Sequence, residues 1–390
     1  VGPRIWRIAR DRNLLTVGDY LELRYGASVR AIVAAFLWLA TLAILAGQLI
    51  AAAWVLEVVA GLPKWAGCLA AGAVMTAYFA AGGLLTSAWV NLVQLAVLLV
   101  GFAVALPVAI SGAGGWETVL AAAPPGRPDW LNFMHGGASG WTYLFLLVPA
   151  FIISPGLIQK IYGARDEVTV RKAGVACGLA LLAFAFVPPL LGMTARAMSP
   201  ELVNPELALP IVLMDGLPLA LGALALAAVF SAEISSADAI LFMLATSLSE
   251  DLWRRFVRPD ATDFEVLRTA RIAAVGGGGA GIILALALPS VIGALAVFYT
   301  LLSVSLFVPL VAGLYSKGPG SPEAIAAILA GVAAVVAAKT AGVPATGLTS
   351  PYVLGLAVSS LAFGAVFLLL RRSRTRSDPP PGDPPPTSSE

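Results

Sequence analysis

The feature that most constrains this chain is a series of apolar runs, each about as long as the 20-residue helix that crosses a lipid bilayer. Hydrophobic residues fill 59% of the 390 positions and charged residues only 12%. We expect an all-α polytopic membrane protein with about ten transmembrane helices. The predicted spans are residues 29–60, 64–82, 86–111, 140–160, 171–195, 217–249, 269–288, 291–314, 322–340 and 351–370.

The basic residues divide unequally if these spans alternate across the bilayer. The clusters in 1–30, 160–172, 254–271 and 371–376, together with Lys317, hold 20 of the 24 Lys and Arg residues. The positive-inside rule places that side, and with it the C-terminus, in the cytoplasm. Because the basic residues lie between apolar runs and not along one face, nucleic acid is excluded as a partner.

Three polar segments flank or interrupt the spans. Residues 1–28 are predicted to form a cytoplasmic surface helix and connector, with Thr16 and Asp19 in a capping-box pattern. Residues 113–139, rich in Pro and Gly, are predicted to be an external loop, and 371–390 a disordered cytoplasmic tail. The chain starts at Val1 without an initiator Met or signal-peptide pattern, so we expect its natural N-terminus to lie further upstream.

One predicted span carries an unusual polar load. The stretch "SAEISSADAILFMLATSLSEDL", residues 231–252, contains four carboxylates and six hydroxyls. Ser235 and Asp238 lie near the middle of that span, where an unpartnered carboxylate costs at least about 2.5 to 3.5 kcal/mol. Helical geometry places Ser235 and Asp238 on one face and turns Glu233 about 140° away from Asp238.

Each of these polar residues also has a structural interpretation. A membrane serine often bonds back to the carbonyl four residues earlier, and Asp238 or Glu233 could be an acid bonded to a neighbouring helix. Glu250 and Asp251, beside two arginines, are predicted to be a solvated helix end. Paired hydroxyls near embedded acids nevertheless favour a site for a hard monovalent cation such as Na⁺, which transporters bind at mid-membrane.

Five motifs, in this order along the chain, resemble those of the sodium:solute symporter family. They are "TVGDYLELRYG" before the first span, "AGQLIAAAWVLEVVAGLP" within it, "GGLLTSAWVNLVQ", "SPGLIQKIYGARDEVTVRK" and "FSAEISSADAILFMLATSLSEDLW". The resemblance implies the five-plus-five inverted-repeat transporter fold. Residues 29–112 would be helices three to five of the first repeat, 140–314 the second repeat, and 315–370 two peripheral helices. The first two core helices have no counterpart here.

The resemblance also implies a sodium site. Carried over residue by residue, it consists of the Ala232 carbonyl and the Ser235 and Ser236 hydroxyls. Two positions depart from the family pattern: Asn91 stands where many members have an acid, and Glu233 where a small uncharged residue is common. Asn91, Glu233 and Asp238 are therefore interpreted as ion-pathway residues.

The solute is constrained less tightly. Residues 144–153, "LFLLVPAFII", are entirely apolar. The sugar carriers of the family that this chain resembles are polar just upstream of the "IQK" motif, so the resemblance disfavours a sugar. The absence of Lys or Arg at mid-membrane disfavours a multiply charged anion. An amino acid, a monocarboxylate or a quaternary amine remains. The predicted pocket residues, each of which could instead serve helix packing, are Gln48, Phe151, Ser154, Tyr299 and Thr300.

Together these patterns predict sodium-coupled symport of a small organic solute by alternating access, in the inner membrane of a bacterium. The sodium ion would be the coupling ion, and no other cofactor is expected. A passive channel or a transporter-like sensor domain is the alternative interpretation. An intramembrane enzyme is disfavoured because the only histidine, His135, lies in the predicted external loop, away from either serine.

Overall fold

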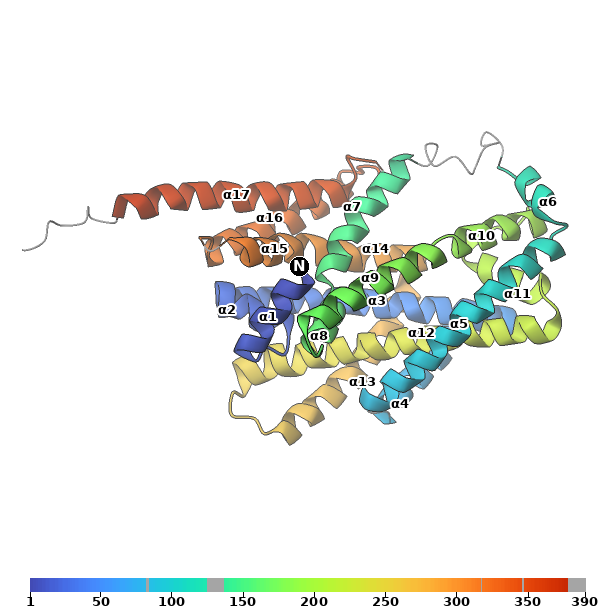
Figure 1. Ribbon diagram of the computed structural model, residues 1–390, viewed down its shortest axis with the longest axis horizontal. Helices are drawn as coiled ribbons and strands as arrows, with labels where there is room; N and C mark the ends of the chain where they lie inside the picture. The colour runs from blue at the N-terminus through green and yellow to red at the C-terminus, as the bar shows by residue number, and fades with distance from the viewer. Residues whose placement is uncertain (82–83, 125–136, 317, 346, 378–390) are drawn as a thin grey trace, which may run out of the picture.

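The computed structural model describes the chain except for residues 82–83, 125–136, 317, 346 and 378–390. For residues 80–91, 137–139 and 372–377, the side chains also lie outside the described set. The described residues form helices and connecting segments, with no strand among them (Figure 1). Nine helical stretches in that part of the chain are long and apolar enough to cross a membrane. Residues Lys64–Ala81 supply the helix of the remaining predicted span. The predicted fold class is confirmed: this is an all-helical integral membrane protein.

The helical segments follow one another in this order: α1 Gly2–Arg12, α2 Val17–Tyr25, α3 Ala27–Ala60, α4 Lys64–Ala81, α5 Leu84–Gly112, α6 Trp116–Ala121, α7 Gly137–Ile153, α8 Pro155–Tyr162, α9 Glu167–Phe184, α10 Val187–Met198, η1 Pro205–Leu207, α11 Ala208–Asp215, α12 Leu219–Thr246, η2 Ser247–Val257, α13 Asp263–Ala287, α14 Val291–Leu302, η3 Ser303–Phe307, α15 Val308–Tyr315, α16 Ser321–Thr340 and α17 Pro351–Ser377. The segments η2 and η3 have π-helical geometry, and η2 continues α12 without a break in the chain.

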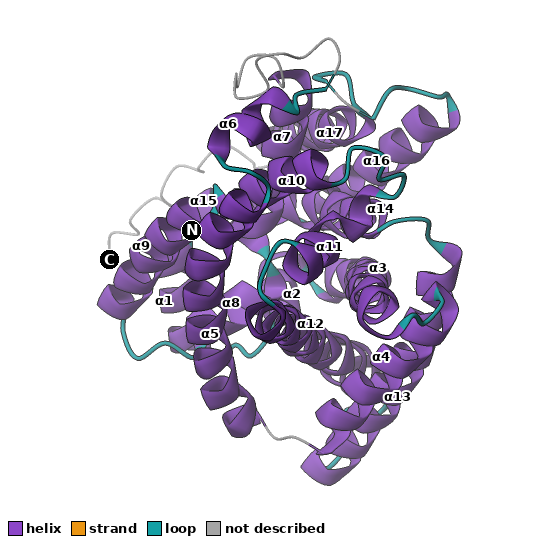
Figure 2. Cartoon of the chain, turned by 90° about the vertical axis from the view of Figure 1, so that its right-hand side faces the viewer, coloured by secondary structure: helices purple, strands orange, loops and turns teal. Residues whose placement is uncertain are grey.

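Helix α3 lies at the centre of the molecule, among α4, α12, α13 and α14 (Figure 2). Its middle turns are buried, and Leu49 and Ile50 pack in one cluster with Leu241 of α12. Glycines let α13 approach closely: a Cβ on Gly277 would lie 2.5 Å from a methyl of Leu244, and one on Gly281 would lie 2.7 Å from a methyl of Leu45. Small residues allow the backbones of membrane helices to approach closely. Here they let α13 pack directly against both α12 and α3.

Local sequence explains where several of these helices begin. The Thr16 hydroxyl accepts from the Asp19 amide and the Asp19 carboxylate accepts from the Thr16 amide, which confirms the predicted capping box at the start of α2. One predicted span, 140–160, is two helices. It is interrupted at Ser154, whose extended backbone precedes Pro155 at the first position of α8, because the residue before a proline is pushed out of helical geometry.

The C-terminal region differs from the prediction. Residues 371–377, expected to belong to the disordered tail, continue the helix α17 to Ser377. Arginines at the C-terminal end of a helix interact favourably with its dipole, so this basic stretch can extend the helix beyond its apolar part. The rest of the predicted tail, from residue 378, lies outside the described residues.

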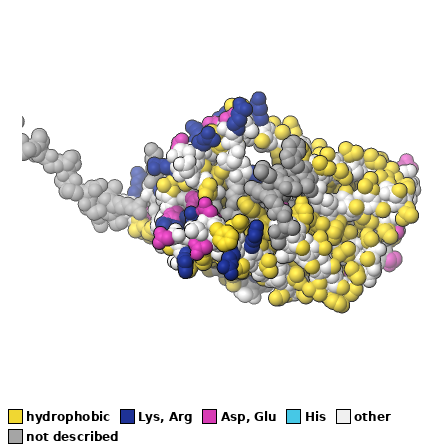
Figure 3. Space-filling model, turned by 90° about the horizontal axis from the view of Figure 1, so that it is seen from below, with side chains coloured by type: hydrophobic (Ala, Val, Ile, Leu, Met, Phe, Trp, Pro, Cys, Tyr) yellow, Lys and Arg dark blue, Asp and Glu magenta, His cyan; other side chains and the backbone are white. Residues whose placement is uncertain are grey.

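The charged side chains are concentrated at one end of the long axis. Seen from below, Lys and Arg side chains gather toward the end that carries α1, α2 and η2, while the other half is mostly apolar (Figure 3). We call the end formed by α1, α2 and η2 the basic end, and the end formed by α6, α11 and the start of α12 the opposite end. A membrane-spanning chain with its charges at one end has an electrostatic polarity along the helix axes.

Candidate functional site

Helix α12 presents two different faces at the level of its paired serines. Ala237 and Leu241 are fully buried against the cluster built around α3. Ser236 lies on the accessible side of the helix, and Ser235, next to it, is half-buried. The two hydroxyls, with the half-buried Ala232 one turn earlier, therefore lie beside the packed face and not within it. Packing therefore leaves Ser236 exposed on this helix.

Two acids sit on the same stretch of α12. Asp238 is half-buried. One carboxylate oxygen of Glu233, Oε2, is buried without a hydrogen-bond partner among the described residues. A buried unpartnered oxygen is costly, which is typical of positions kept for function. Ser231 accepts a hydrogen bond of 2.7 Å from the amide of Gln94, and this bond ties α12 to α5.

Two residues singled out from the sequence cannot be placed. Asn91 belongs to the described backbone of α5, but its side chain lies outside the described residues. His135 lies outside the described residues altogether. The predicted ion-pathway role of Asn91 therefore remains a prediction.

The predicted solute residues lie on three neighbouring helices, with α14 packed against both α3 and α7. The rings of Phe151 on α7 and Tyr299 on α14 stack with centroids 5.5 Å apart. Phe151 is 50% exposed, so this aromatic pair has an open side. Gln48 is half-buried on α3, and Ser154 is half-buried at the break between α7 and α8. The structure brings the two aromatic residues together.

Thr300 differs from the other predicted solute residues. Its side chain is buried, and its hydroxyl donates to the Ala296 carbonyl one turn earlier at 2.5 Å. Such a bond to the helix's own backbone is the ordinary structural use of threonine in a membrane helix.

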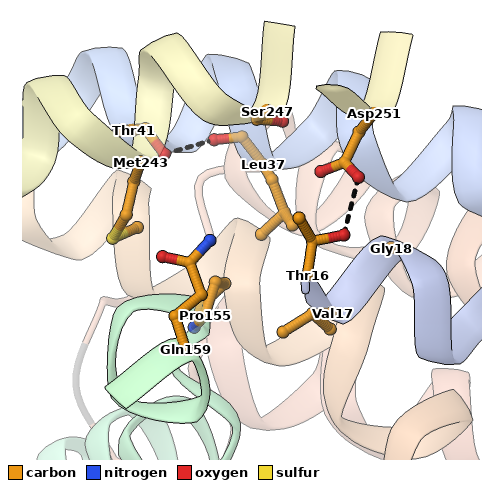
Figure 4. A pocket seen from close by; sticks show the side chains of 10 residues that line it. All are labelled: Thr16, Val17, Gly18, Leu37, Thr41, Pro155, Gln159, Met243, Ser247 and Asp251. Carbon is orange, nitrogen blue, oxygen red and sulfur yellow. Dashed lines mark hydrogen bonds between the residues drawn. The ribbon is translucent and has the colours of Figure 1, made fainter. Parts of the chain in front are cut away.

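A polar site that the sequence did not reveal lies at the basic end, where η2 meets α2 and α3. Asp251 was expected to be a solvated helix end, but it is only 5% exposed. Its Oδ1 accepts hydrogen bonds of 2.7 Å from the Thr16 hydroxyl and 2.7 Å from Arg30 Nη2 (Figure 4 shows the bond from Thr16). The prediction was wrong because α2 folds back over this turn of η2 and covers it.

The same arginine connects further acids of α2. Arg30 Nη1 lies 2.8 Å from Glu22 and 2.9 Å from Asp19, and Glu22 also accepts from Arg255 Nε at 3.0 Å. Burial disfavours the charged form of Glu22, but hydrogen bonds from Arg255 and Arg30 outweigh it and hold the pKa of Glu22 below its ordinary value. The available sequence signal was the density of opposite charges before the first predicted span and after the sixth.

At the opposite end a single carboxylate joins three segments. Glu206 in η1 accepts a 2.6 Å hydrogen bond from the indole nitrogen of Trp54 on α3 and another of 2.6 Å from the Val291 amide at the start of α14. Both donors are neutral. Nearby, the Lys64 ammonium donates to the Leu288 carbonyl at 2.7 Å.

Comparisons with known proteins point to one family. The model of the sodium:solute symporter family matches residues 3–331. The chain is 28% identical to the sodium/pantothenate symporter of Escherichia coli (strain K12), in an alignment that covers 93% of this chain and 77% of that protein. It is 25% identical to the high-affinity choline transporter 1 of Caenorhabditis elegans, over 73% of this chain and 52% of the transporter.

A solved structure resembles the whole architecture. It is the substrate-bound, outward-open state of a sodium-coupled sialic acid symporter, with a TM-score of 0.77 over 93% of this chain and 79% of that one. The identity is 16%, so this likeness establishes the fold and not the solute.

Proposed function

The chain belongs to the sodium:solute symporter family, and from this premise we propose that it moves a small organic solute across a membrane together with Na⁺, by alternating access. It is a sodium-coupled transport protein and not an enzyme. The pantothenate symporter and the choline transporter carry chemically different solutes, so the family alone does not fix the solute of this chain.

The proposed sodium site consists of the Ala232 carbonyl and the Ser235 and Ser236 hydroxyls on α12. Its main support is the position of the serines, which lie beside the packed face of the helix with Ser236 accessible. Neutral oxygens of this kind can replace the hydration shell of Na⁺ within a membrane. Glu233 and Asp238 add negative charge along the same helix, and we assign both, with Asn91, to the path by which the ion enters or leaves.

For the solute we propose an amino acid, a monocarboxylate or a quaternary amine held near Gln48, Ser154 and the aromatic pair of Phe151 and Tyr299. The open side of that pair supports a solute with an apolar or cationic group, since aromatic faces attract both. Thr300 is the weakest member of this set, because its hydroxyl is already used within α14.

For the orientation we propose that the basic end, and with it the C-terminus, faces the cytoplasm of a bacterial inner membrane. The distribution of Lys and Arg between the two ends supports this assignment. It would be checked with Arg165→Cys, at a 92% exposed side chain between α8 and α9, in a chain that also carries Cys177→Ser. A membrane-impermeant thiol reagent is added to intact cells or to inverted vesicles.

Uptake into proteoliposomes tests the function. A solute panel is presented with and without an inward sodium gradient, and accumulation above the external concentration distinguishes coupled transport from a passive channel. We expect Ser235→Ala and Ser236→Ala each to raise the sodium concentration needed for half-maximal uptake about tenfold or more, equivalent to about 1.4 kcal/mol of lost ion binding. The order of preference among solutes should stay unchanged.

Ser360→Ala is the matched control, because Ser360 is an exposed serine on α17 whose hydroxyl bonds back to the Leu356 carbonyl at 2.8 Å. It should transport as the unmodified chain does. Unchanged sodium activation in both α12 variants would overturn the sodium-site assignment, and downhill flux without accumulation would favour a channel.

A further inference from the structure

A small polar cavity lies at the basic end of α12, well away from the paired serines. Its volume is about 20 Å³, close to the space that one water needs. Thr16 of α2, Gln159 of α8, and Ser247 and Asp251 of η2 contribute polar groups to its wall (Figure 4). The Ser247 hydroxyl is buried without a hydrogen-bond partner among the described residues.

The cavity lies along the helix that carries the proposed sodium site. Ser247 follows Ser235 by twelve residues, which is about 18 Å of helix at 1.5 Å per residue. It therefore occupies the stretch between that site and the basic end. An ion or solute leaving along α12 toward this end would have to pass the place where α2, α8 and η2 meet.

Two glycines allow the walls of the cavity to close. A Cβ on Gly18 of α2 would lie 2.6 Å from Asp251 Oδ1, so any larger residue there must displace the carboxylate or the backbone of α2. On the other side, a Cβ on Gly156 of α8 would lie 2.8 Å from the Met243 sulfur. The backbones of α2 and α8 thus lie directly against the α12–η2 helix, and the cavity lies between them.

The α2 side of this closure combines apolar packing with polar bonds, since Val17 is buried in one cluster with Leu37 and Ile158. Asp251 binds Thr16 and Arg30, and Arg30 in turn binds Glu22 of α2. An ion pair of this kind is favourable only while its geometry and hydrogen bonds are complete. Opening this contact therefore requires water to hydrate both charges and Val17 to leave its apolar neighbours.

We propose that Asp251 and Arg30, covered by the turn Thr16–Gly18 of α2, form a latch that closes the α12 route at the basic end. The latch opens when the start of α2 separates from η2, and Arg30 acts as a positioning residue that holds the Asp251 carboxylate against Thr16. The identification of the route rests on the proposed transport function, whereas the latch itself is a property of the fold.

Thiol labelling of the cavity tests the latch without requiring transport. Ser247→Cys is placed in a chain carrying Cys177→Ser, since Cys177 is exposed and Cys68 is buried. The purified full chain in lipid nanodiscs is reacted with a positively charged methanethiosulfonate reagent, which can then reach both ends of the protein. We expect slow labelling of this starting variant, because the cavity is too small to admit the reagent while the latch is closed.

Thr16→Val and Gly18→Ala are then added separately to that background. Each should accelerate labelling by about tenfold. Thr16→Val removes the bond to Asp251 together with the N-cap bond of α2, and the methyl of Gly18→Ala would lie 2.6 Å from Asp251 Oδ1 and displace it. Glu167→Gln is the control at the same end of the molecule. Glu167 pairs with two exposed arginines, Arg7 of α1 at 3.2 Å and Arg171 at 2.6 Å, and does not line the cavity. It should leave the rate unchanged.

Thermal unfolding of each variant verifies that the chain remains folded. Unchanged labelling in folded Thr16→Val and Gly18→Ala variants would overturn the latch, as would equal acceleration by Glu167→Gln. Repeating the assay with and without Na⁺ separates the two proposals. Acceleration by both latch variants with no sodium effect supports the latch and counts against the sodium-coupled function.

Discussion

The two ends of this molecule are joined by different chemistry. At the basic end, the buried Arg30 links Asp251 of η2 to Asp19 and Glu22 of α2 through contacts of 2.7 to 2.9 Å. At the opposite end, Glu206 accepts hydrogen bonds from two neutral donors, the Trp54 indole and the Val291 amide. One end is held by a network of several charges, and the other by separate charged groups, Glu206 and Lys64, that bind neutral partners.

This difference implies that the ends respond to different perturbations. A buried ion pair is sensitive to removal of one partner, because the other charge is then left in a poorly solvated place. A carboxylate that binds neutral donors loses only hydrogen bonds, and the donors can turn to water if they are not deeply buried. A substitution can therefore weaken the contacts at one end of the molecule without weakening those at the other, which suits the proposed alternating access.

The largest expected effect follows from removing the arginine at the basic end. Arg30→Ala leaves Asp251 buried without its charged partner, and we expect the free energy of unfolding to fall by about 3 to 5 kcal/mol. Thermal or SDS-induced unfolding of the protein in detergent micelles measures the change. The double variant Arg30→Met with Asp251→Leu should recover only part of that loss. Apolar residues of similar volume can replace a buried pair, but Asp19 and Glu22 still lose their arginine.

Arg171→Ala is the control for this prediction. Arg171 pairs with Glu167 one helical turn away, but its side chain is 67% exposed, and removal of an exposed pair costs at most about 1 kcal/mol. If Arg30→Ala cost no more than Arg171→Ala, the two ends would not differ in the way described.

A smaller loss is expected at the opposite end. Glu206→Ala leaves the half-buried Trp54 indole and Val291 amide without their acceptor, and we expect about 1 to 3 kcal/mol less stability by the same unfolding measurement. Glu201→Ala, an exposed acid in the same connecting segment, should have almost no effect. A loss equal to that of Arg30→Ala would indicate that both ends depend on a single charge to the same degree.

The sequence was sufficient for the parts of the fold that depend on one helix at a time. Apolar runs predicted the spans, and Thr16 with Asp19 predicted the start of α2, because both signals are local. The break at Ser154 also has a local cause, Pro155 at the first position of α8. The extension of α17 to Ser377 was missed because composition resolves the end of a helix poorly.

The site was predictable only in part, because its polar groups come from segments far apart in the chain. The stack of Phe151 on Tyr299 requires α7 to lie against α14, a relation that no local pattern encodes. Asp251 illustrates the same limit: its arginine neighbours in sequence suggested solvent, but its partners are Thr16 and Arg30, more than 200 residues away. Only the folded arrangement of α2 over η2 makes that acid buried.

The smallest predicted effect concerns pH at the basic end. Because hydrogen bonds from Arg255 and Arg30 hold the pKa of Glu22 below its ordinary value, the charged form stabilises the folded state. That contribution is fully present above the pKa of Glu22 in the unfolded chain and is lost as pH falls through the lower, folded value. The melting temperature of Glu22→Gln should therefore lie below that of the unmodified chain at neutral pH, and the two should converge in acid. Glu201→Gln, at the opposite end, controls for the loss of a carboxylate. If the difference in melting temperature between Glu22→Gln and the unmodified chain stayed constant into acid, Glu22 would stabilise the basic end by packing and not by charge.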